Sequence, residues 1–250
     1  MRTLHIPEIS YPGTWLAFED QATDHEVLLL LHFLEDRVVE AAISLGLFQD
    51  SLPARETVQE RWEADRALEA GVRKMVAEIS GNKLAGYLLP FATLQSLVLA
   101  RRRETGSAPW VYEHKLPFIH AHSFVFALDS FGKFLDAICE VERISEVVAA
   151  LRDAFNGRLP MLRKIRNSAA HAEDRTRRYG KPEDKKAGKK MAVEGFLGLS
   201  NLNGYKLGYT IDDGSYQEIE VSQTNLQLMV DTLNRVLEAL PWTGPARVAP

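Results

Sequence analysis

Hydrophobic residues recur every three to four positions along most of the first 176 residues, which is the spacing of one buried helix face. The clearest helix begins at the capping pair Thr23-Asp24 and is expected to end near Leu45, before Gly46. Its predicted buried stripe consists of Leu28, Leu31, Leu34 and Val38. Residues 1–22 contain two prolines and a glycine, so we expect an irregular arm there.

The same spacing predicts further helices along the first two thirds of the chain. Their expected ranges are 55–79, 84–103, 118–139, 145–155 and 161–176. Pro90 should kink its helix or begin a new one, because proline breaks the hydrogen-bond ladder of a helix interior. Residues 104–117 include two prolines and a glycine and are predicted to form a loop.

The periodicity changes after residue 190. Three short segments rich in β-branched and aromatic residues, 193–199, 205–211 and 216–221, are predicted to be strands. They are joined by Asn203-Gly204 and Asp213-Gly214, which are typical hairpin turns. Ser222 can then cap a last helix, and the tail from Pro241 is expected to be loop.

These elements predict a mainly α fold with a small C-terminal antiparallel β-meander and a terminal helix. We expect three regions: a helical bundle with its N-terminal arm over 1–176, a basic linker over 177–192, and the meander plus helix over 193–250, packed on the bundle. The chain has 250 residues, 46% of them hydrophobic and 26% charged, which is ordinary for a globular protein with a substantial core.

Composition also bears on the compartment. The strongest apolar run is far shorter than the roughly 20 residues that cross a bilayer, and the N-terminus lacks the apolar segment of a secretion signal. The single cysteine, Cys139, lies among apolar residues and cannot form an intramolecular disulfide. We therefore expect a cytoplasmic protein that does not enter the membrane.

Charge is distributed unevenly along the chain. The net charge is −4, but residues 163–190 contain eleven Lys or Arg and four Asp or Glu. This window has a local balance of +7, which leaves −11 for the rest. Such a basic segment on an acidic protein indicates a specific anionic partner, or alternatively a solvated linker that stays unfolded because it is charged.

Arg166-Asn167-Ser168-Ala169-Ala170-His171 is the stretch best suited to chemistry. On one helix Asn167 and His171 would share a face, whereas Arg166 would lie about 140° from His171 and reach it only by its length. Histidine exchanges protons near neutral pH, and arginine binds phosphate oxygens. A base beside an anion clamp suits metal-free RNA cleavage, in which the ribose 2′-hydroxyl attacks the adjacent phosphate.

This stretch resembles the Arg-polar-x3-His motif of the HEPN superfamily, whose members are helical bundles and often prokaryotic toxin or defence components. Many members are metal-independent endoribonucleases whose site forms at a two-fold dimer interface. The resemblance implies that Arg166 stabilises phosphate, His171 is the acid and base, and Asn167 supports them. It covers six residues closely and the helices of 24–176 loosely. The segment 193–240 is not part of the usual family pattern.

The function predicted on this basis is RNA cleavage or RNA binding as a homodimer. Basic residues on and after the motif would attract the RNA backbone. These are Arg163, Lys164, Arg175, Arg177 and Arg178. The alternatives are a non-catalytic dimerisation or protein-interaction module, and an unrelated helical protein whose meander binds a peptide or protein.

A metal or cofactor site is not expected. His120-Ala121-His122, with His114 nearby, is the best metal candidate. On the predicted helix the pair His120 and His122 would diverge by about 200°, and the segment offers no acidic or cysteine partner at ligand spacing.

Overall fold

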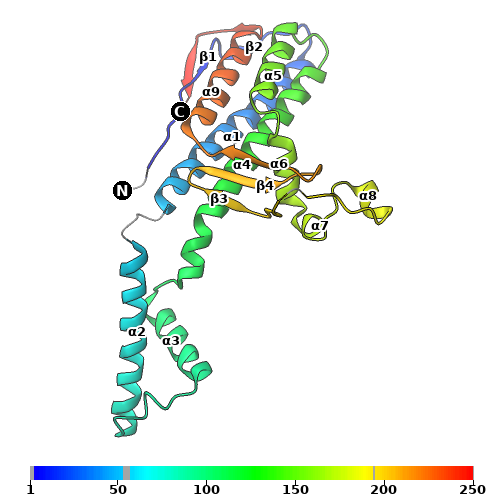
Figure 1. The fold of residues 1–250 in the computed structure, drawn as a ribbon. Helices are drawn as coiled ribbons and strands as arrows, with labels where there is room; N and C mark the ends of the chain where they lie inside the picture. Colours follow the sequence, from blue (N-terminus) through cyan, green and yellow to red (C-terminus); the bar gives the residue numbers. More distant parts are fainter. Residues whose placement is uncertain (1–2, 53–56, 194, 250) are drawn as a thin grey trace. The chain divides into compact units, whose positions relative to one another are not determined.

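The structure is a computed structural model that describes residues 3–52, 57–193 and 195–249. The first part of the described chain forms β1 (Ile9–Tyr11), β2 (Trp15–Leu16), α1 (Gln21–Ser51), α2 (Thr57–Ser80), α3 (Phe91–Thr105), α4 (Trp110–Glu140) and α5 (Glu146–Arg158) (Figure 1). The second part forms α6 (Leu162–Ala170), α7 (Ala172–Thr176), α8 (Pro182–Lys186), β3 (Asn201–Asn203), β4 (Lys206–Thr210), β5 (Tyr216–Glu220), α9 (Gln223–Glu238), β6 (Trp242–Thr243) and β7 (Arg247–Ala249). The predicted fold class, mainly helical with a small C-terminal antiparallel sheet, is confirmed.

The chain divides into two compact units. The first comprises residues 1–50 and 118–250, and the second comprises residues 51–117 between them. The boundaries predicted at 176 and 193 both fall inside the first unit. All of the candidate site residues belong to that unit.

The core of the first unit is built from the apolar faces of α1, α4, α5 and α9. Phe131 of α4 packs against Phe155 of α5 with ring centroids 5.1 Å apart, and both side chains are almost fully buried. Phe33 of α1 stacks on Phe134 of α4 at 5.1 Å. Burial of the Phe131 and Phe155 side chains stabilises the fold by about 1.5–3 kcal/mol each, whereas Phe33 remains 42% exposed.

The two ends of the chain pair with each other, which corrects the prediction of an irregular arm and a loop tail. β1 pairs antiparallel with β7, and β2 pairs antiparallel with β6. The arm also passes close to Gly46, which lies inside α1 instead of ending it. A Cβ at Gly46 would lie 2.2 Å from the Thr3 carbonyl oxygen, so glycine is needed there for close approach.

Several helix boundaries differ from the prediction. α1 begins at Gln21 because the Asp20 carboxylate accepts hydrogen bonds from the backbone N–H groups of Ala22 and Thr23. α4 begins at Trp110 and contains Pro117, so 110–117 is helix and not loop. The expected start of the second helix at 55 lies outside the described residues.

The meander has the predicted two turns but a different first strand. Its order is β3-β4-β5, all antiparallel, and Gly204 and Gly214 turn the chain with φ of 60° and 88°. In the described part of 193–199 the backbone is not a strand. Only Gly198 bonds to the meander there, through the N–H and hydroxyl of Thr210.

The second unit consists of α2, α3, the segments around them and the first residues of α4. Among its described residues, Val72, Leu94 and Pro117 are the apolar side chains that are buried. Arg73 of α2 donates to the Gly86 carbonyl at 2.9 Å, which fastens the connecting turns to the helix. No helix in the described chain combines the length and the apolar character needed to cross a bilayer.

Candidate functional site

The predicted helix over 161–176 is broken at His171, so the motif does not lie on one continuous helix. α6 carries Arg166 and Asn167 and ends at Ala170, and α7 begins at Ala172. His171 between them has φ −121° and ψ 43°, outside the helical region. Its N–H still donates to the Asn167 carbonyl at 3.0 Å, which is the last bond of the α6 ladder.

Arg166 is held between α4 and α6. Its Nε lies 3.2 Å from Oδ2 of Asp129, its Nη1 donates to Oδ1 of Asn167 at 3.0 Å, and its guanidinium lies 5.1 Å from the centre of the Phe126 ring. The side chain is 27% exposed and lines a cavity of about 480 Å³ between α1 and α4.

Asp129 is the residue at this site that the motif does not predict. It is 2% exposed, and besides Arg166 it faces Lys133 Nζ at 2.7 Å and Arg163 Nε at 3.3 Å. One buried carboxylate is thus shared by three cations. The sequence signal was present, since an aspartate within the apolar run of α4 needs a partner when that helix is buried.

His171 lies in a different environment. Its side chain is 59% exposed, and its Nδ1 is 3.8 Å from Oε1 of Glu173, an ion pair only when the ring is protonated. It lines a pocket of about 260 Å³ together with Asn167, Lys164 and Asp212. Asn167 therefore contacts Arg166 and also borders the pocket of His171, while Arg166 and His171 line two separate cavities.

Arg175, one of the predicted RNA-binding residues, is buried and bonded within the protein. It is 5% exposed and donates to Ser168 Oγ at 3.1 Å and to the carbonyls of Tyr179 and Gly180 at 2.6 and 2.7 Å. Burial lowers the pKa of its guanidinium, and nearby Asp212 opposes that shift. Its role is to fix the turn that follows α7.

The other predicted RNA-binding residues are exposed but differ in their partners. Arg163 lies against Asp129 and Asp136. Lys164 lies between Asp212 and Asp213 at 3.8 and 3.5 Å. Arg177 lies 5.3 Å from the Tyr179 ring. Arg178 is exposed and has a φ of 63°.

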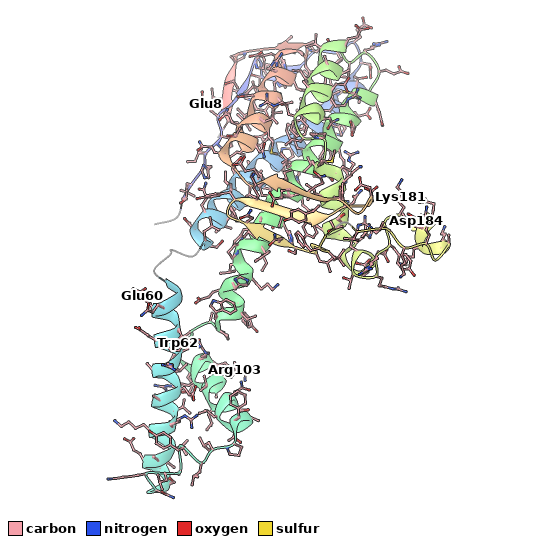
Figure 2. The ribbon with its side chains drawn as sticks, in the orientation of Figure 1. Glu8, Glu60, Trp62, Arg103, Lys181 and Asp184 are labelled. Carbon is pink, nitrogen blue, oxygen red and sulfur yellow. The ribbon has the colours of Figure 1, made fainter. Side chains whose placement is uncertain are left out.

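The basic segment after α7 is largely exposed and contains the short helix α8. Figure 2 labels Lys181, which precedes α8, and Asp184, which lies within it. Lys185 forms an ion pair with Asp174 at 2.6 Å, and Lys190 donates to the Arg177 carbonyl at 2.7 Å. The Lys185 ammonium holds the pKa of Asp174 below its usual range.

Two groups of side chains are candidate metal ligands. His171, Glu173 and Asp174 have ligand atoms within 4.8 Å of one another, but Lys185 already neutralises Asp174. In α4, His122 faces the Tyr209 hydroxyl of β4.

Comparisons of the chain with protein-family models, with curated proteins and with solved structures give no match.

Proposed function

We propose that this protein binds RNA and cleaves it without a metal ion, using Arg166, Asn167 and His171. The supporting observation is the position of Asn167, whose Oδ1 accepts a hydrogen bond from Arg166 while the residue borders the pocket of His171. This amide lies between a phosphate-binding guanidinium and an exposed imidazole. The likeness of the stretch to the HEPN motif agrees with these roles.

The proposed reaction is transesterification at one phosphodiester. The ribose 2′-oxygen attacks the adjacent phosphorus, the bond from phosphorus to the 5′-oxygen breaks, and His171 takes the 2′-hydroxyl proton. The 5′-oxygen leaves with a proton from water or from the protonated His171 of a second copy. The products are a 2′,3′-cyclic phosphate and a 5′-hydroxyl end. Arg166 stabilises the charge that develops on the phosphate oxygens.

The proposal includes a homodimer, because Arg166 and His171 line separate cavities of one chain. In a two-fold dimer, Arg166 of one copy can face His171 of the other. The apolar side chain of Ile43, which is 57% exposed beside the Arg166 cavity, offers a surface for such contact.

The test is cleavage of a mixed-sequence RNA in the presence of a chelator. We expect the wild type to release 2′,3′-cyclic phosphate ends, and His171→Ala and Arg166→Ala to lose at least 100-fold in rate, the scale of acid–base catalysis. His25→Ala removes an exposed histidine of α1 and should keep full activity. Equal cleavage by all four proteins, or none by the wild type, would refute the catalytic assignment.

The second candidate is a non-catalytic interaction module, which the separation of Arg166 from His171 favours. In that case the apolar residues Ile43 and Phe126 would bind a protein and no cyclic phosphate would appear. Sedimentation of the wild type and of Ile43→Asp distinguishes self-association from a monomer that needs another partner.

A further inference from the structure

We propose that the cavity between α1 and α4 is a phosphate-binding site, in which Arg37 is a second anion-binding arginine beside Arg166. The cavity has a volume of about 480 Å³. It lies in the first unit and is lined by Arg37, Ser44, Phe126, Ser130 and Arg166, among others. This inference extends the proposed function by locating where the RNA backbone binds next to the motif.

Arg37 has hydrogen-bonding capacity that the described protein does not use. Its Nη2 pairs with Oε1 of Glu40 at 2.8 Å, and its side chain is 24% exposed. The Nε atom is buried, and within the described chain it has no hydrogen-bond acceptor. Because the Nε atom is buried, only the Nη groups of this side chain can reach an anion in the cavity.

Ser44 contributes a second donor to the same wall. It is 8% exposed and lines the cavity, and its hydroxyl forms no hydrogen bond with any described residue. It lies one helical turn beyond Glu40 on α1. A hydroxyl and a guanidinium donor on one wall match the oxygens of a phosphate group.

Arg166 completes the donor set from the opposite side. Its Nε faces Asp129 and its Nη1 donates to Asn167, so Nη2 is left without a partner among the described residues. Lys133 and Arg163 share the Asp129 carboxylate with Arg166. Glu40 also lines the cavity, so its ionised lining consists of Arg37, Arg166 and Glu40, a formal charge of +1 that favours an anionic ligand.

The exposed ring of Phe126 indicates that the ligand is a phosphate group of a nucleic-acid chain. Its ring is 38% exposed and borders the cavity next to Arg166. Aromatic rings beside phosphate-binding groups stack the unpaired bases of single-stranded RNA. We therefore assign the cavity to the backbone of single-stranded RNA.

The test measures binding apart from cleavage, with a short single-stranded RNA whose 2′-hydroxyls are methylated and cannot attack the phosphate. Arg37→Met should weaken binding about 10-fold in fluorescence anisotropy and reduce the slope of log affinity against log salt by about 0.7, the loss of one phosphate contact. Ser44→Ala should weaken binding about 3-fold. The matched control is Arg101→Met, since Arg101 pairs with Glu104 in the same i, i+3 arrangement on α3 at 3.0 Å.

Unchanged affinity and salt slope in Arg37→Met would overturn the assignment, as would an equal loss in Arg101→Met. A second measurement does not depend on variants: in the wild type, inorganic phosphate and the oligonucleotide should both shift the Arg37 Nε–H signal in NMR. No shift with either ligand would also overturn it. Because the probe cannot be cleaved, binding lost in Arg37→Met supports the site even if the wild type cleaves no RNA.

Discussion

The two halves of the motif are held by different forces. The Arg166 guanidinium is held by the buried Asp129 carboxylate of α4 and by the neighbouring Asn167 of α6. His171 lies at a break between two short helices, with its ring exposed. A guanidinium that must hold charge benefits from a rigid setting, whereas an imidazole that exchanges protons needs access to water and substrate. We therefore expect substitutions at the buried carboxylate beside Arg166 to lower the free energy of unfolding more than substitutions at exposed charges.

The largest effect is expected at Asp129. Asp129→Asn leaves Lys133, Arg163 and Arg166 without their shared negative charge, so the free energy of unfolding should fall by about 2–4 kcal/mol. Urea denaturation measures this loss. Asp153→Asn removes a carboxylate that is 69% exposed and should change stability by less than about 0.5 kcal/mol. Equal losses of unfolding free energy in the two variants would contradict the expectation that the buried carboxylate stabilises the fold more than the exposed one.

An intermediate loss of stability is expected for substitution of Arg175, the buried residue that fixes the turn after α7. Arg175→Met leaves the Tyr179 and Gly180 carbonyls and Ser168 without their donor, at a cost of about 1–3 kcal/mol. Arg177→Met is the control, because Arg177 is exposed. Thermal unfolding should show a clear drop for the first variant alone. The same stability for both variants would mean that the turn after α7 does not depend on Arg175.

The smallest effect is expected at Lys164. Its ammonium lies 3.8 and 3.5 Å from Asp212 and Asp213, and its side chain is 44% exposed. Lys164→Met should therefore change the free energy of unfolding by about 0–1 kcal/mol, with less effect at high salt. Denaturation at two salt concentrations tests this. A loss above about 2 kcal/mol would mean that Lys164 stabilises the fold as strongly as a buried ion pair does.

The helices and turns that the sequence predicts correctly have strong local signals. Ser145 and Ser222 cap α5 and α9 through their side chains, and Gly204 and Gly214 adopt the positive φ of hairpin turns. Each signal acts within three or four residues. The strand prediction was wrong for the described part of 193–199, because only Gly198 there bonds to β4, and β3 (Asn201–Asn203) forms the ladder with β4 instead.

The candidate site was predicted only in part. The motif residues were identified because their chemistry is evident from their type and spacing. The sequence did not point to Asp129, Arg37 or Ser44, because the role inferred for each depends on a residue of another helix. The sequence did not reveal the environment of Arg175, because charge alone does not show that a guanidinium is buried and bonded to carbonyls.

The sequence by itself determined the helical class, the two hairpin turns, the last helix and the identity of the motif residues. These features follow from periodicity, caps and glycines, which act over one or two turns of chain. The tertiary structure alone decided that the chain ends pair, that the motif helix breaks at His171, and that α1 and α4 enclose a cavity beside Arg166. Such contacts join residues far apart in the chain, so their energies depend on the packing of whole elements.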